Sequence, residues 1–295
     1  MTKFLSYCLI AVLCGGLALS LSGTNLARDA KPEDRFAKLD SIRVHYQNYG
    51  QGQDAVVMIH GWSCNLNFWK ANAPALAGHS RVITIDLPGH GQSDKPQTAY
   101  SMDLFARAVD AVLQDAKVER ATLVGHSMGT PVIRQFYRHY PAKTRALVIV
   151  DGSLQPFGNK AAMEKFLAPL REPTYKQAAE SMIGFMVTPI KDPATRDEVK
   201  TAMLSTPQHV MTSAFDGMLD ESIWKNQDPI QVPALVVMAK RDSLTPEYER
   251  FVRGLIPGVD YQLWDGVSHF LMMDEPQKFN DAVTAFLKKN QLIKN

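Results

Sequence analysis

The residues best suited to chemistry lie in one Gly-x-Ser-x-Gly segment, Gly125-His126-Ser127-Met128-Gly129. An apolar, β-branched run at residues 121–124 precedes this segment, and a helix-compatible stretch at 132–140 follows it. Two glycines allow a tight strand-to-helix turn that bulkier side chains would block, and such a turn raises the serine hydroxyl above the sheet. The positive end of the following helix would stabilise an oxyanion beside that hydroxyl. We therefore predict that Ser127 is a nucleophile.

A serine nucleophile needs a histidine to take its proton and a carboxylate to orient that histidine. Asp242 follows the apolar run 234–238, and His269 follows a plausible strand at 261–264. The chain order Ser, Asp, His is the one that accompanies this type of serine turn. We therefore predict His269 as the base and Asp242 as its acid partner. Asp151, directly after the run 146–150, is the alternative acid.

These residues must be positioned by a largely parallel sheet. Short apolar runs at 55–59, 82–85, 121–124, 146–150 and 234–238 are each followed by turn residues and a longer mixed segment, which is typical of buried parallel strands alternating with helices. Residues 42–49 alternate apolar and polar side chains and predict an antiparallel strand that starts the sheet at its edge. Residues 276–289 predict a closing helix.

The strand rhythm stops in the middle of the chain. Residues 154–228 contain helix-compatible stretches at 161–170, 175–187 and 197–204 instead, so we predict a helical cap inserted into a core formed by residues 28–153 and 229–295. Six methionines in this cap either line an adaptable apolar pocket or fill the space between its helices.

Taken together, these motifs resemble those of the α/β-hydrolase superfamily, in its cap-bearing serine esterase and haloperoxidase-like branch. The resemblance includes the segment 58–62, similar to the family's strand-His-Gly loop, and the segment 86–94, similar to its Asp-x-x-Gly-x-Gly-x-Ser turn. It implies an α/β fold with a mostly parallel central sheet flanked by helices and a helical cap. A departure is Pro131, which fits only the first turn of a helix, so that helix should begin close to Ser127.

The resemblance also implies how the chemistry proceeds. The oxyanion hole would consist of the backbone N–H groups of Trp62 and Met128. A role for Trp62 as a buried core residue is the alternative, since large aromatic side chains are usually buried. We expect a serine esterase that forms an acyl-enzyme with a small-molecule substrate carrying an apolar acyl group, without a cofactor. Hydrolysis of C–C bonds, perhydrolysis, and a non-enzymatic receptor on the same scaffold remain alternatives. Relatives with an Asp nucleophile, such as dehalogenases and epoxide hydrolases, are excluded because position 127 is Ser.

Composition and the N-terminal residues bear on the partners and the cellular location of the protein. The formal net charge is +2 with dispersed basic residues, which gives no reason to expect nucleic acid as a partner. Residues 1–27, a lysine near the start followed by an apolar run, predict a signal peptide and export to the periplasm or the exterior, with an uncleaved membrane anchor as the alternative. The histidines lack ligand-spaced partners, so no metal site is predicted.

Overall fold

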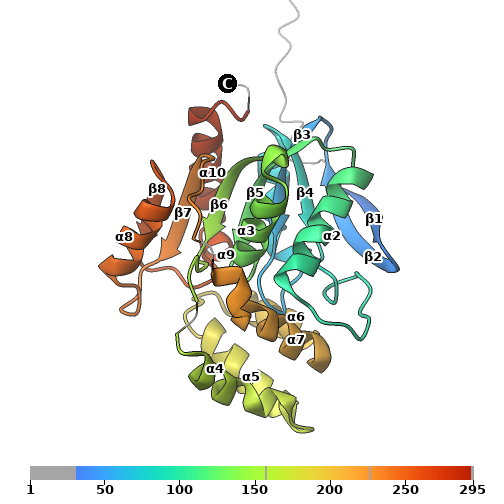
Figure 1. Ribbon diagram of the computed structural model, residues 1–295, viewed down its shortest axis with the longest axis vertical. Helices are drawn as coiled ribbons and strands as arrows, with labels where there is room; N and C mark the ends of the chain where they lie inside the picture. The colour runs from blue at the N-terminus through green and yellow to red at the C-terminus, as the bar shows by residue number, and fades with distance from the viewer. Residues whose placement is uncertain (1–30, 157, 226, 294–295) are drawn as a thin grey trace, which may run out of the picture.

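A twisted sheet forms the centre of the fold (Figure 1). The computed structural model describes residues 31–156, 158–225 and 227–293. Within them, eight strands follow the order β1-β2-β4-β3-β5-β6-β7-β8, in which β2 pairs antiparallel with β1 and β4 and all other pairs are parallel. The strands are β1 (Glu33–Leu39), β2 (Ile42–Tyr49), β3 (Asp54–Ile59), β4 (Arg81–Ile85), β5 (Arg120–His126), β6 (Thr144–Val150), β7 (Ala234–Ala239) and β8 (Asp260–Trp264).

The apolar runs of the sequence coincide with the central strands. Every residue of β7 is buried, and β3 to β6 are buried except at their first residues or near them. Helices cover both faces of a parallel sheet, so its strands are apolar throughout instead of alternating. The α/β fold with a mostly parallel sheet, expected from the sequence, is confirmed.

The edge of the sheet differs from the prediction. Residues 42–49 do form β2, but β2 is the second strand, and β1 occupies the edge next to it. Strand β1 carries Glu33, Asp34, Arg35 and Lys38 among its seven residues, and only Ala37 and Leu39 are buried. Charged side chains on an edge strand discourage pairing with other chains, and they also remove the apolar pattern by which a strand is recognised in the sequence.

Helices flank the sheet on both sides. The helices α2 (Met102–Asp115) and α3 (Gly129–His139) pack together in front of it, while α10 (Pro276–Lys289) lies behind it, as Figure 1 shows. The bounds of α10 are those predicted from the sequence. The short helix α1 (Ala73–Ala77) packs against α10, and α8 (Pro246–Leu255) follows β7.

Between β6 and β7 the described residues form helices and loops only. Four α-helices, α4 (Lys160–Leu167), α5 (Tyr175–Val187), α6 (Pro193–Leu204) and α7 (Gln208–Leu219), lie below the sheet in Figure 1, at the carboxyl ends of its parallel strands. The first three overlap the predicted stretches, whereas α7 was not predicted. We refer to residues 154–228 as the cap.

The predicted signal peptide or anchor at residues 1–27 lies outside the described residues. Among the residues that are described, no helix has both the length and the apolar character needed to cross a membrane.

Candidate active site

Ser127 lies at a sharp turn between β5 and α3. Its backbone φ of 51° falls in the left-handed region, which is costly for a residue with a side chain. The turn persists because its surroundings fix it: the Ser127 N–H donates to the Val150 carbonyl at 3.0 Å, and the Ser127 carbonyl accepts from Thr130 N–H at 2.9 Å. The predicted strand-to-helix turn at this serine is therefore present.

The two glycines of the turn are required by close contacts. A Cβ at Gly125 would lie 2.4 Å from the Gly129 carbonyl oxygen, and a Cβ at Gly129 would lie 2.6 Å from the Ile59 carbonyl oxygen. Pro131 occupies the first turn of α3, which begins at Gly129. The prediction that this helix begins close to Ser127, made because proline fits only the first helical turn, is confirmed. The N-terminus of α3 is thus held directly behind the serine.

His269 lies in the loop between β8 and the short helix α9 (Leu271–Asp274). Its Nδ1 lies 2.6 Å from Oδ2 of Asp151, and its backbone carbonyl accepts a hydrogen bond from Nε2 of His126 at 2.9 Å. Burial, together with the neighbouring His269, lowers the pKa of His126 to about 3, so His126 is a neutral donor. His269 and Ser127 both line the same cavity.

The carboxylate that contacts His269 belongs to Asp151, and the prediction that Asp242 takes this position was wrong. Asp242 is exposed in a turn three residues beyond the end of β7. Asp151 follows β6 immediately, and its backbone N–H donates to the Val237 carbonyl of the adjacent strand at 2.8 Å. This hydrogen bond and a φ of 43° direct the chain so that the Asp151 side chain is fully buried against His269.

The Asp151 carboxylate is surrounded by donors. Besides His269, the Ala239 N–H donates to its Oδ1 at 2.9 Å, and Nη1 of Arg241 lies 2.7 Å and 2.8 Å from its two oxygens. Burial by itself would raise the pKa of Asp151, but His269 and Arg241 more than offset this and lower it to about 2. Asp151 is therefore ionised at neutral pH. Sequence reasoning missed Arg241, because nothing in a basic residue after a strand indicates where its side chain points.

The loop after β3 passes close to Ser127. A Cβ at Gly61 would lie 3.1 Å from Cβ of Ser127, so the Gly61–Trp62 backbone passes close to the turn. Trp62 is 4% exposed and lines the cavity, while its indole N–H donates to the Met211 carbonyl of α7 at 2.8 Å. Met128 is buried at the start of α3. Both residues predicted for the oxyanion hole thus lie beside Ser127.

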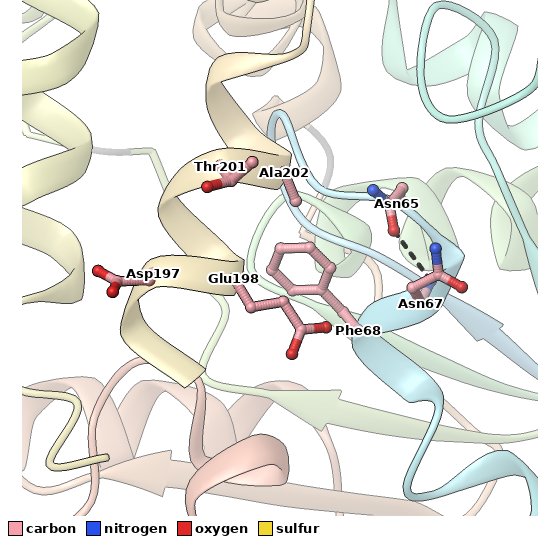
Figure 2. Close-up of a pocket in the computed structure, with 7 residues that line it drawn as sticks. All are labelled: Asn65, Asn67, Phe68, Asp197, Glu198, Thr201 and Ala202. Atoms are coloured by element: carbon pink, nitrogen blue, oxygen red, sulfur yellow. Dashed lines mark hydrogen bonds between the residues drawn. The ribbon is translucent and has the colours of Figure 1, made fainter. Parts of the chain in front are cut away.

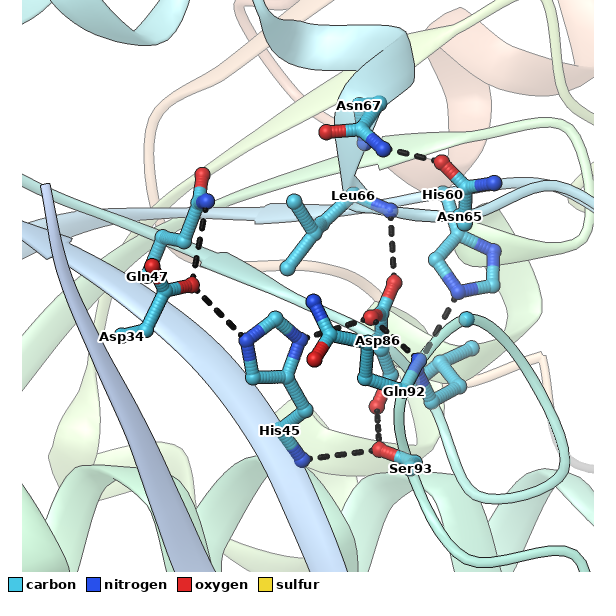
Figure 3. A network of polar contacts seen from close by, with 12 residues as sticks. Asp34, His45, Gln47, His60, Asn65, Leu66, Asn67, Asp86, Gln92 and Ser93 are labelled. Carbon is cyan, nitrogen blue, oxygen red and sulfur yellow. Dashed lines mark hydrogen bonds and ion pairs between the residues drawn. The ribbon is translucent and has the colours of Figure 1, made fainter.

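A buried polar network holds this loop in place (Figure 3). The carboxylate of Asp86, at the end of β4, accepts hydrogen bonds from the backbone N–H groups of Leu66 at 2.8 Å and Gln92 at 2.9 Å and lies 2.7 Å from Nδ1 of His45. The Ser93 hydroxyl donates to the Asp86 carbonyl at 2.6 Å and accepts from the His45 N–H at 2.8 Å. The Asp-x-x-Gly-x-Gly-x-Ser segment therefore has a structural role, because it ties the loops after β3 and β4 to β2.

The cavity that reaches Ser127 has a volume of about 830 Å³. Apart from Ser127 and His269, its wall is almost entirely apolar, and among the described residues that line it none is Lys, Arg, Asp or Glu. Phe185 and Phe166 of the cap are 83% and 58% exposed although they line this cavity, so the apolar wall extends to the surface. The lining residues are Trp62, Ser127, Phe166, Pro169, Leu170, Ala178, Ser181, Met182, Phe185, Met186, Phe215, Met218 and His269.

A second hollow lies between the cap and the loop after β3 (Figure 2). It has a volume of about 390 Å³ and is lined by residues of α6, among them Glu198 and Thr201, and by Asn65, Asn67 and Phe68. Next to it, Lys70 forms an ion pair with Glu198 at 2.5 Å. This hollow contains neither Ser127 nor His269, and the Lys70–Glu198 ion pair beside it joins α6 to the core.

Comparisons with known proteins agree with the fold. The family model described as the α/β-hydrolase fold matches residues 54–276. The pimeloyl-[acyl-carrier protein] methyl ester esterase of Vibrio cholerae is 29% identical, over 83% of this chain and 98% of the esterase. The 2-hydroxy-6-oxononadienedioate/2-hydroxy-6-oxononatrienedioate hydrolase of Paraburkholderia phymatum is also 29% identical, over 83% of this chain and 91% of that hydrolase.

Among solved structures, Est816, described as an N-acyl homoserine lactone degrading enzyme, superimposes with a TM-score of 0.73 at 28% identity, covering 85% of this chain and 100% of Est816. Because the family match spans well over half of the chain, this protein belongs to the α/β-hydrolase family and is a hydrolase.

Proposed function

We propose that this hydrolase cleaves carboxylic esters that carry an uncharged, apolar acyl group, with Ser127 as nucleophile, His269 as general base and Asp151 as the acid that orients His269. The observation that carries the proposal is the 2.6 Å contact between His269 and the buried Asp151 at a cavity that also exposes Ser127. A strained serine, a histidine and a buried carboxylate together are the parts of an acyl-transfer site.

The contact with Asp151 sets the state of the base. An ionised carboxylate only accepts hydrogen bonds, so Nδ1 of His269 carries a proton and Nε2 keeps its lone pair. That lone pair takes the Ser127 proton during attack on the carbonyl and later returns it to the leaving alcohol. A water molecule, deprotonated in the same way, then releases the acid from the acyl-enzyme.

Oxyanion stabilisation completes the mechanism. The first N–H groups of a helix have no partner within that helix, so the Met128 N–H at the start of α3 is available to a ligand. The Trp62 N–H belongs to the loop that passes next to Ser127. Removal of one such donor typically costs about a hundredfold or more in kcat, which is why two fixed donors matter.

The cavity wall indicates the substrate class. The Vibrio cholerae and Paraburkholderia phymatum relatives are named for a pimeloyl methyl ester and for dioates, and a dioate carries two carboxylates. A carboxylate brought into this cavity would meet Phe, Met and Leu side chains, and the described lining residues include no Lys or Arg to pair with it. Burial of an unpaired charge is unfavourable. Apolar acyl chains fit instead, and each buried methylene contributes about 0.8 kcal/mol, or up to about fourfold in kcat/KM.

The experiment is fluorophosphonate labelling of the protein, combined with hydrolysis of p-nitrophenyl esters of increasing acyl length. We expect labelling in the wild type, none in Ser127→Ala or His269→Ala, and full labelling in Ser181→Ala. Ser181 is the matched control because it lines the same cavity while its hydroxyl donates to the Gln177 carbonyl at 3.0 Å. A folded wild type without labelling would refute the proposal and favour a binding protein on this scaffold.

The acyl-length profile tests the substrate class separately. We expect kcat/KM to rise with chain length in the wild type, and to peak at shorter chains in Ala178→Phe, which fills part of the cavity. Ala194→Phe, exposed at the start of α6, is the control and should keep the wild-type profile. A preference for anionic esters over neutral ones would contradict the proposed class while leaving the triad intact.

A further inference from the structure

We infer that Arg241 is a positioning residue of this active site, which fixes the Asp151 carboxylate and shares its negative charge with His269. The inference rests on the proposed triad, in which the Asp151 carboxylate is the acid partner of His269. This carboxylate is paired on two sides, with His269 and with Arg241. His269 approaches Oδ2 at 2.6 Å, while Nη1 of Arg241 bridges both carboxylate oxygens at 2.7 Å and 2.8 Å.

The arrangement follows from the site of the acid. Asp151 lies at the end of β6, and Arg241 lies two residues beyond the end of the adjacent β7, so the loop after β7 supplies a cation where Asp242 was expected to supply the acid. The Asp151 side chain is 0% exposed, and that of Arg241 is 43% exposed. The guanidinium therefore closes the solvent side of a buried carboxylate.

Charge sharing has a defined consequence for the base. The protonated form of His269 is stabilised by the negative charge of Asp151, and a cation on the same carboxylate weakens that stabilisation. Removal of the Arg241 charge should therefore favour the protonated form of His269, which cannot take the Ser127 proton.

Other charged groups around His269 are weaker candidates for this role. His126 of β5 is neutral, and the cavity wall contributed by the cap is uncharged among its described residues. Asp274 of α9 accepts from the Ser268 N–H at 2.6 Å, and Lys240 pairs with Asp265 at 3.2 Å on the surface. From the cap, Lys191 lies near Gly266. Arg241 is the described cation that touches the Asp151 carboxylate itself.

The test is the pH dependence of kcat/KM for an uncharged p-nitrophenyl ester, measured for the wild type and for Arg241→Gln, Arg241→Met, Arg241→Lys and Lys240→Gln. Both neutral replacements of Arg241 should move the midpoint of the acid limb upward by about half to one pH unit. They should lose most activity near about pH 5 and little near about pH 8. Arg241→Lys should recover at least part of the shift, and Lys240→Gln should retain the wild-type profile.

Thermal melts at both pH values establish that each variant is folded, and fluorophosphonate labelling of wild-type Ser127 reports independently on the proposed function. A purely structural role for Arg241 predicts lower stability or lower kcat at every pH with an unmoved acid limb. If the wild type is labelled and the acid limb of folded Arg241→Gln or Arg241→Met coincides with that of the wild type, this inference is overturned and the triad stands.

Discussion

Replacement of Asp151 by Asn is the most direct perturbation of the site. Asn retains an oxygen that can accept from the Ala239 N–H and from Arg241, which leaves its amide group facing Nδ1 of His269. An amide N–H pointing at Nδ1 favours the tautomer whose proton is on Nε2, and that tautomer cannot take the Ser127 proton. In a serine protease of another fold, the equivalent replacement lowers kcat about ten-thousandfold.

We therefore expect kcat of Asp151→Asn to fall by about a thousandfold to ten-thousandfold, equivalent to about 4–5.5 kcal/mol of transition-state stabilisation. Stability should fall much less, by about 1–2 kcal/mol, because Arg241 is 43% exposed and water can solvate it when its partner loses charge. The assay is kcat on a p-nitrophenyl ester with the active-site concentration titrated, together with urea unfolding of the same samples.

Asp242→Asn is the matched control, since Asp242 is exposed and is the acid that the sequence favoured. We expect its kcat to stay within about twofold of the wild type, as is usual for a surface substitution. The reasoning would be refuted if Asp242→Asn lost more activity than Asp151→Asn, or if a folded Asp151→Asn kept a tenth or more of the wild-type kcat.

Two further predictions concern stability. Gly125→Ala should destabilise the fold by about 2–3 kcal/mol, because its Cβ would lie 2.4 Å from a backbone oxygen. Gly184→Ala in α5, whose Cβ would have no atom within 4 Å, should stabilise the fold by about 0.5–1 kcal/mol. Equal effects of the two substitutions in urea unfolding would contradict this reasoning. Burial lowers the pKa of His45, but Asp86 and Asp34 outweigh burial and hold it above its ordinary value. The stabilisation from His45 should therefore be complete below about pH 6.5 and should be lost as the pH rises through the higher pKa of the folded state. The difference in urea midpoint between the wild type and His45→Gln should accordingly shrink with rising pH. A difference that grew with rising pH would contradict the role of this network.

The central sheet could be predicted because each of β3 to β7 is buried on both faces and therefore consists of a continuous apolar run. β1 could not, because an edge strand with one exposed face and many charges has no such run. Helix α7 was missed for another reason: its residues Gln208–Leu219 include β-branched side chains and Gly217, and burial of Val210, Ala214 and Met218 against the core stabilises it.

Within the site, the placement of Ser127 and His269 at one cavity could be predicted, and the carboxylate that contacts His269 could not. The glycines around Ser127 and the position of His269 after β8 are local features of the chain. Asp151 and Asp242 both follow a buried strand, and the choice between them depends on which side chain turns inward. That direction follows from the hydrogen bond of Asp151 to Val237 on the neighbouring strand, which no local pattern records.

The hydrogen bond from the Trp62 indole to the Met211 carbonyl links the loop beside Ser127 to α7 of the cap. Cap and core are therefore not independent modules for protein engineering. A chimaera that exchanges residues 154–228 for the cap of another family member replaces the α7 backbone that positions the acceptor for this buried indole, and so puts at risk a support of the loop that adjoins Ser127. Chimaeras that keep α7 and exchange only the segment from α4 to α6 preserve this link.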